Sequence, residues 1–265
     1  MSEHPITARW RGRGGGGAHG RALIPYLTAG FPTAAASREA LRRVAAAGAD
    51  LVEVGVPFSD PLADGPTIQR TTQVALEQGM TAAGVLALIR EAALAVPVVI
   101  MTYLNPVLAY GGGSVERFVA DAHAAGAAGL LLTDLPAGAD PAIEQSVMRS
   151  PLALIRLVAP TTDDARLRTA LAGASGFVYL ISRLGVTGAR DRVPPDLEAQ
   201  VRRVRAATPL PVAVGFGIST AAQAAAAARY ADGVVVGSAL MDALARGGVD
   251  ELERSVRELA AAVHE

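Results

Sequence analysis

The sequence predicts an α/β protein built as a single (β/α)8 barrel, the TIM-barrel architecture with a parallel eight-stranded core. Short apolar segments alternate along the chain with longer segments of helical spacing, and there are eight such apolar segments. They are apolar on both faces, which is typical of parallel strands covered by helices. The length of 265 residues also suits this fold, which needs roughly 250.

The predicted strands each run into a turn rich in Gly, Pro, Asp or Asn. They are Ala22–Thr28, Asp50–Val54, Pro97–Thr102, Gly129–Thr133, Leu152–Leu157, Phe177–Ile181, Pro211–Gly215 and Gly233–Val236. Helical spacing lies between them, for example in Arg38–Ala47, Ala82–Leu94, Val115–Ala125 and Leu197–Ala206, and Asp250–Val263 predicts a closing helix. Similar small-residue turns precede four of the strands, which favours one repeated design and one domain.

The barrel domain is expected to span residues 21–265. Residues 1–20 do not share its pattern, because the run Gly12–Gly17 is broken only by Arg13 and cannot form a stable helix. We therefore expect a glycine-rich, mobile N-terminal tail, in which Trp10 has no evident partner.

Composition excludes several classes of chemistry. The chain has no cysteine, which excludes disulfides, thiol nucleophiles and Cys-ligated metals. All 24 basic residues are arginine, so this chain has no lysine amine for a Schiff base. No histidine ends a predicted strand, and we expect no metal site.

Net charge and hydropathy indicate which partners and which cellular location to expect. A net charge of -1 argues against nucleic acid as a partner. No apolar run reaches the ~18 residues of a membrane span. The N-terminus also lacks the apolar core of a signal peptide, which predicts a cytoplasmic protein.

The second predicted strand carries the sharpest catalytic signal. Period-2 alternation puts Val52 and Val54 on one face and Glu53 on the other. Since two valines suit the helix-covered outside, Glu53 should point into the barrel, where burial raises a carboxyl pKa toward the range of a general acid or base. A structural Glu–Arg pair is the alternative. The following loop holds Asp60 and Asp64, which ordinary turn chemistry would explain equally well.

Glycines after the last strands predict a phosphate site. Phe216-Gly217 follows the seventh strand, Gly237-Ser238 follows the eighth, and a helix is expected to begin at Ser238. Backbone N–H groups at such glycines and the positive end of a helix bind anions, and these loops are the recurrent phosphate site of the fold. The loop after the sixth strand contains Gly185 and Gly188 and is either a closing lid or an ordinary exposed loop.

Several of these segments, in this order, resemble the tryptophan synthase alpha subunit family. The block from Glu53 to Pro66 is the most specific. The resemblance also rests on Leu23–Pro32, Met101–Pro106, Thr133–Pro136, Ala159–Thr162, Tyr179–Arg190 and the two glycine loops.

The resemblance implies retro-aldol cleavage of indole-3-glycerol phosphate to indole and glyceraldehyde 3-phosphate, in tryptophan biosynthesis. It implies that Glu53 protonates indole C3 and relays the hydroxyl proton, that Asp64 stabilises the charge at the indole N–H, and that Tyr179 helps to position Glu53. The remaining implied site residues bind the phosphate (Gly188, Gly217, Gly237 and Ser238) or form the pocket and lid (Tyr26, Thr187 and Phe216).

The resemblance further implies a beta subunit as partner, in an alpha2beta2 heterotetramer. The beta subunit would carry pyridoxal phosphate, and this chain would need no cofactor. The implied interface residues lie in the loops after the second, third and fourth strands (Pro57, Asp60, Asn105, Pro106 and Pro136). Members of the family usually open with a helix under the barrel, where this chain has its glycine-rich segment.

Alternatives stay open at this point. The chain could be a stand-alone lyase that releases free indole for secondary metabolism, or a non-catalytic regulatory subunit. Glu53, Asp64 and Tyr179 together disfavour the regulatory subunit. A phosphate-binding isomerase would fit the barrel and the glycine loops but would not need the Asp60–Asp64 loop.

Overall fold

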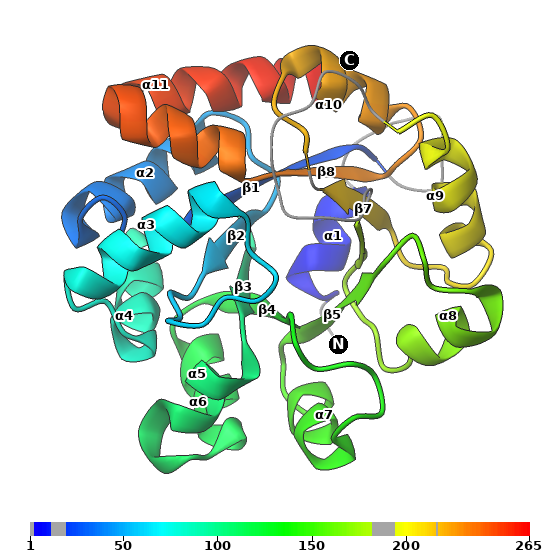
Figure 1. Cartoon of the computed structure of the whole chain (residues 1–265), viewed down its shortest axis with the longest axis horizontal. Helices are drawn as coiled ribbons and strands as arrows, with labels where there is room; N and C mark the ends of the chain where they lie inside the picture. The colour runs from blue at the N-terminus through cyan, green and yellow to red at the C-terminus, as the bar shows by residue number, and fades with distance from the viewer. Residues whose placement is uncertain (1–2, 12–19, 182–193, 216) are drawn as a thin grey trace.

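A computed structural model describes residues 3–11, 20–181, 194–215 and 217–265. Eight parallel strands close into a barrel in sequence order, which confirms the predicted fold (Figure 1). The strands are β1 (Ala22–Thr28), β2 (Val52–Gly55), β3 (Val98–Thr102), β4 (Ala127–Leu132), β5 (Ala153–Val158), β6 (Val178–Ile181), β7 (Val212–Gly215) and β8 (Gly233–Val236).

Helices surround the barrel. They are α1 (Pro5–Arg11), α2 (Ala34–Ala46), α3 (Pro66–Glu77), α4 (Ala82–Ala92), α5 (Leu104–Ala109), the short 3-10 helix η1 (Tyr110–Gly112), α6 (Val115–Ala124), α7 (Pro141–Met148), α8 (Asp164–Ala170), α9 (Leu197–Arg205), α10 (Ala221–Ala228) and α11 (Ser238–His264). Helix α11 begins at the predicted residue and is kinked at Gly248, whose φ is 67°. None of the helices described here is both long and apolar enough to cross a membrane.

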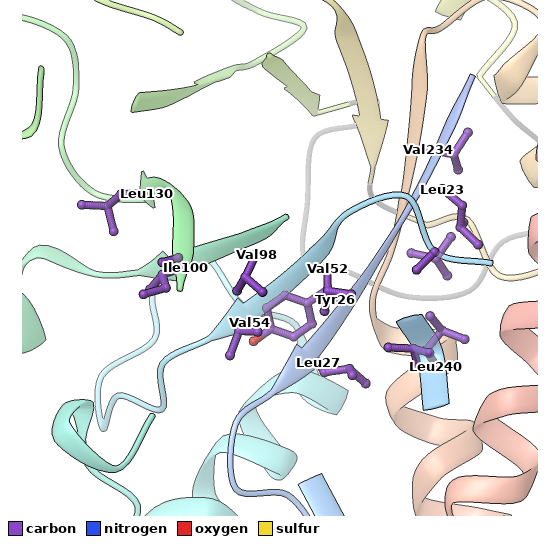
Figure 2. Close-up of a cluster of buried hydrophobic side chains, with 14 of the residues drawn as sticks. Leu23, Tyr26, Leu27, Val52, Val54, Val98, Ile100, Leu130, Val234 and Leu240 are labelled. Carbon is purple, nitrogen blue, oxygen red and sulfur yellow. The ribbon is translucent and has the colours of Figure 1, made fainter. Parts of the chain in front are cut away.

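Two hydrophobic layers follow from strand alternation. Val52 and Val54 pack in the outer layer between strands and helices, part of which Figure 2 shows. Leu51 packs in the inner layer, inside the barrel, with residues such as Val99 and Leu131. The predicted outward orientation of the two valines is therefore confirmed, and Glu53 between them faces inward.

The N-terminal segment departs from the expected unstructured tail over residues 5–11. Ile6 and Trp10 of α1 are fully buried, and Trp10 packs against Phe177 with ring centroids 5.9 Å apart. A Cβ on Gly233 would lie 2.5 Å from the Trp10 ring, so the glycine makes room for the indole at the barrel bottom. Helix α1, near the centre of Figure 1, thus covers the bottom of this barrel.

A buried carboxylate links both ends of the chain to the barrel bottom. Asp50 accepts a hydrogen bond from the Leu23 N–H at 2.9 Å. Its other contacts are Arg9 Nε of α1 at 3.5 Å and His264 Nε2 of α11 at 2.7 Å. The first and last described helices therefore meet at one strand-loop residue.

We predict that Trp10→Ala lowers the free energy of unfolding by about 3–5 kcal/mol, because it leaves a cavity under the barrel. Urea denaturation measures the loss. Arg11→Ala on the exposed side of the same helix is the control, since its surface pair with Glu3 contributes about 1 kcal/mol or less. A loss under 1 kcal/mol for Trp10→Ala would contradict the packing of α1.

Candidate active site

One pocket opens at the carboxyl ends of the strands, where the active sites of this fold lie. It encloses about 730 Å³, counting its mouth. The described residues that line it are Tyr26, Glu53, Asp64, Thr67, Ile68, Met101, Tyr179, Gly217, Ile218, Ser219, Val235, Gly237, Ser238, Ala239 and Asp242. Carboxylates and tyrosines therefore share one cavity with a glycine-rich loop and a helix start.

Glu53 is buried at the floor of this pocket. It is 1% exposed, and its Oε1 has no hydrogen-bond partner among the described residues. Burial, and secondarily the charge of Asp64, raises the pKa of Glu53 to about 8. At neutral pH the carboxyl is therefore protonated and can donate a proton.

Two tyrosines flank Glu53. Tyr26 is its register partner on β1, and Tyr179 reaches the pocket from β6. A Cβ on Gly55 would lie 2.0 Å from the Tyr26 hydroxyl oxygen, and one on Gly215 would lie 2.2 Å from that of Tyr179. Both glycines are thus needed for the rings to lie where they do. Burial raises the pKa of both phenols, so they remain neutral.

Asp64 lies in the loop between β2 and α3, and its environment differs from that of Glu53. Burial raises its pKa, whereas a hydrogen bond from Tyr103 opposes the rise by stabilising the carboxylate. The Tyr103 hydroxyl also accepts from the Ala63 N–H at 2.9 Å. Tyr103 therefore holds the loop and favours the charged form of Asp64.

Tyr103 was not among the residues singled out from the sequence. It directly follows β3 and packs against Phe58 of the β2–α3 loop, with the two rings tilted and their centroids 5.3 Å apart. The position of a tyrosine at a strand end was the available signal. The sequence pattern could not show that this side chain meets Asp64, in a loop 39 residues earlier in the chain.

The described residues of the predicted phosphate site lie at the same pocket. Gly217, with φ 81°, Gly237 and Ser238 line it, and Gly237 is the N-cap residue of α11. Free N–H groups at the start of a long helix favour an anion. Asp242, one turn further along, accepts from Arg70 at 2.8 Å and from Thr67 at 3.3 Å, which links α11 to the first turns of α3.

The structure brings together seven of the predicted site residues. They are Tyr26, Glu53, Asp64, Tyr179, Gly217, Gly237 and Ser238. Thr187, Gly188 and Phe216 lie outside the described residues.

The predicted interface residues do not line the pocket and lie in segments that follow β2, β3 and β4. Asn105 and Pro106, expected in a loop, belong to the short helix α5. Pro57 and Asp60 lie in the β2–α3 loop, and Pro136 lies in the turn after β4. Asp60 is exposed and accepts from the Ser59 hydroxyl at 2.5 Å. No cluster of metal-ligating side chains occurs in the described part of the chain.

Comparison with known proteins identifies relatives over nearly the whole chain. The family described as tryptophan synthase alpha chain matches residues 17–265. A tryptophan synthase alpha chain from Acidiphilium cryptum is 50% identical over 232 residues, which are 86% of this chain and 83% of the relative. One from Gluconacetobacter diazotrophicus is 49% identical, covering 91% and 90%.

Solved tryptophan synthase structures are also similar to this chain. A chain of Mycobacterium tuberculosis tryptophan synthase is 41% identical and superposes with a TM-score of 0.87, covering 98% of this chain and 97% of that one. Tryptophan synthase subunit alpha from Legionella pneumophila is 30% identical, with a TM-score of 0.86 and 99% of both chains covered.

We predict that Glu53→Gln stabilises the protein increasingly as pH rises from about 5 to 8. The folded parent retains a proton up to a pKa of about 8, whereas an unfolded Glu releases it near 4.5. The parent protein therefore loses stability as pH rises across that window. In urea denaturation, the free energy of unfolding of Glu53→Gln should rise relative to that of the parent by about 1 kcal/mol per pH unit. Exposed Glu258→Gln should show no such trend, and a flat difference for Glu53→Gln would contradict a buried neutral carboxyl.

We predict that Tyr103→Phe raises the pKa of Asp64, because it removes the hydrogen bond that stabilises the carboxylate. Carbon-13 NMR of the Asp64 side chain across pH measures the change. The matched control is Tyr230→Phe, on a half-exposed ring outside the pocket. An unchanged or lowered Asp64 midpoint would show that Tyr103 does not set its charge.

Proposed function

This chain belongs to the tryptophan synthase alpha chain family, and we propose that Glu53 and Asp64 carry out the family's reaction in the pocket described above. The chain is a lyase that cleaves indole-3-glycerol phosphate to indole and glyceraldehyde 3-phosphate in tryptophan biosynthesis. The single observation that supports the assignment of roles is the pair of carboxyl groups in one pocket: burial raises the pKa of both, and Asp64 also receives a hydrogen bond from Tyr103 that opposes the rise.

Glu53 moves the proton in both directions. As the protonated acid it donates to indole C3, which makes the ring an electron acceptor, and the resulting carboxylate then removes the proton of the glycerol hydroxyl next to the ring. The C–C bond breaks, its electrons return to the ring, and an aldehyde forms. Glu53 ends protonated again, so one carboxyl group balances the reaction.

Asp64 supplies the compensating charge. The ring nitrogen becomes positive when C3 is protonated, and a carboxylate that accepts from the indole N–H stabilises this state. The hydrogen bond from Tyr103 opposes the effect of burial and favours the anion of Asp64. Tyr179 and Tyr26 line the ring's side of the pocket and limit water at Glu53.

The phosphate end of the substrate would lie at the N-terminus of α11. Gly217, Gly237 and Ser238 are the described groups for it, and we also assign Gly188 to the phosphate and Thr187 and Phe216 to closure over the substrate, from the family resemblance. Because the indole ring itself accepts the electrons, the reaction requires no cofactor in this chain.

A beta subunit that carries pyridoxal phosphate is the proposed partner, in an alpha2beta2 assembly in the cytoplasm. Its docking surface would comprise Pro57, Asp60, Asn105, Pro106 and Pro136. These residues follow β2, β3 and β4 at the same end of the barrel as the pocket. Indole released from the pocket would therefore emerge next to the partner.

We predict that Glu53→Gln lowers indole release at least 100-fold while substrate still binds, since a positioned acid/base contributes about 10²–10⁴-fold. Indole formation from indole-3-glycerol phosphate, with and without a beta subunit, is the assay, and Glu258→Gln is the control. Residual activity within tenfold of the parent would overturn the role of Glu53. Fast release that ignores the beta subunit would indicate a stand-alone lyase.

A further inference from the structure

An acidic side chain lines the end of the pocket that the proposed function assigns to the phosphate. Asp242 lies four residues beyond Ser238 on helix α11, and both residues line the pocket together with Gly217 and Gly237. Residues four apart on a helix lie on the same face, with Cβ atoms about 5–6 Å apart. The Asp242 carboxylate therefore lies about one helical turn from the N–H groups that would bind the anion.

This arrangement puts a like charge beside the proposed phosphate. The described residues that line the pocket include three carboxyl groups, on Glu53, Asp64 and Asp242, and no basic side chain. A phosphate ester carries a charge of about −1.5 to −2 near neutral pH. Two charges closer together than the Debye length, about 8 Å at physiological ionic strength, are only partly screened by salt. An unpaired Asp242 carboxylate would therefore weaken binding of the phosphate end.

Helix α3 supplies the opposite charge. Arg70 Nη2 donates to Asp242 Oδ1 at 2.8 Å, and it is the one basic group paired with Asp242 in the part of the chain that the structure describes. The Thr67 hydroxyl, one turn earlier on α3, lies 3.3 Å from both carboxylate oxygens. Thr67 lines the pocket and Arg70 does not. The guanidinium therefore neutralises the carboxylate from outside the cavity.

We propose that Arg70 is a positioning residue for the phosphate end of the substrate: it neutralises Asp242 and holds that carboxylate against α3, so that an anion binds at the start of α11. The inference rests on the proposed phosphate site and gives a role to a charged pair that the reaction described above does not use. Because Arg70 acts through Asp242, its effect should vanish when Asp242 carries no charge. That dependence distinguishes this role from a direct attraction between Arg70 and the phosphate.

The test is a calorimetric titration with glycerol 3-phosphate, which carries the phosphate end of the substrate without the indole ring. The proteins are the parent, Arg70→Gln, Asp242→Asn and the double variant. Because the Arg70 side chain is 56% exposed, its replacement should leave folding intact. Arg70→Gln should bind the ester about three- to tenfold more weakly, since an unpaired carboxylate then repels it. Asp242→Asn should bind at least as tightly as the parent, and the double variant within about twofold of it.

Further measurements separate this effect from general damage to the pocket. Indole is uncharged and should bind to the parent and to Arg70→Gln with equal affinity. The difference in affinity for glycerol 3-phosphate should shrink as salt is added, because salt screens the repulsion. Arg70→Lys keeps the charge and should bind the ester nearly as the parent does. Arg38→Gln, which breaks an exposed pair with Glu91 between α2 and α4, is the matched control and should change neither affinity.

An unchanged affinity of Arg70→Gln for glycerol 3-phosphate would overturn the proposal. A double variant that binds as weakly as Arg70→Gln would also overturn it, because Arg70 would then attract the anion directly. A parent that binds indole but not the ester would remove the phosphate site and this inference with it.

Steady-state kinetics keep the inference apart from the proposed lyase role. Arg70→Gln should raise KM for indole-3-glycerol phosphate about three- to tenfold and leave kcat within about twofold of the parent, since it removes binding and not chemistry. An unchanged KM would contradict the role of Arg70. Activity retained by Glu53→Gln would instead contradict the assigned reaction, whatever Arg70→Gln does.

Discussion

The exclusion of water from one carboxyl group, Glu53, is the constraint on which the proposed chemistry of this barrel depends. A charged carboxylate in such a place is costly, so the group keeps its proton to a pKa of about 8. The barrel supplies that environment through its wall, where Tyr26 and Tyr179 line the same pocket as Glu53. They can do so only because glycine occupies positions 55 and 215. The raised pKa of the proposed catalytic acid is thus a property of the barrel's packing as much as of the glutamate.

The second carboxyl group of the pocket, Asp64, differs from Glu53 in its hydrogen bonding. Asp64 is carried by a loop and receives a hydrogen bond from Tyr103, which partly offsets the effect of burial. This difference supports the proposed roles, Glu53 as the acid and Asp64 as the anion. Tyr103 directly precedes helix α5, whose first N–H donates to Asp134 of the β4 loop at 2.7 Å. A partner that docks on these loops would therefore act close to Asp64.

Much of this could be predicted from the sequence, because the informative signals are local. Period-2 alternation was enough to turn Glu53 inward, and the Gly237-Ser238 pair located the start of α11. Helix α1 was missed because the neighbouring glycine run dominated the composition, although Ile6 and Trp10 have the i, i+4 spacing of one buried helix face. Tyr103 was missed for another reason. The Ala63 N–H that donates to it is 40 residues away in sequence, and the two meet only when the barrel closes.

The most direct test of the account is a crystal structure of Glu53→Gln with indole-3-glycerol phosphate bound. The account predicts the indole N–H on the Asp64 carboxylate, and C3 about 3–3.5 Å from the side chain at position 53, as proton transfer requires. It also predicts the phosphate at Gly237 and Ser238, on the first N–H groups of α11. An indole nitrogen directed at another group, or a phosphate bound away from α11, would contradict the division of roles between the two carboxyl groups.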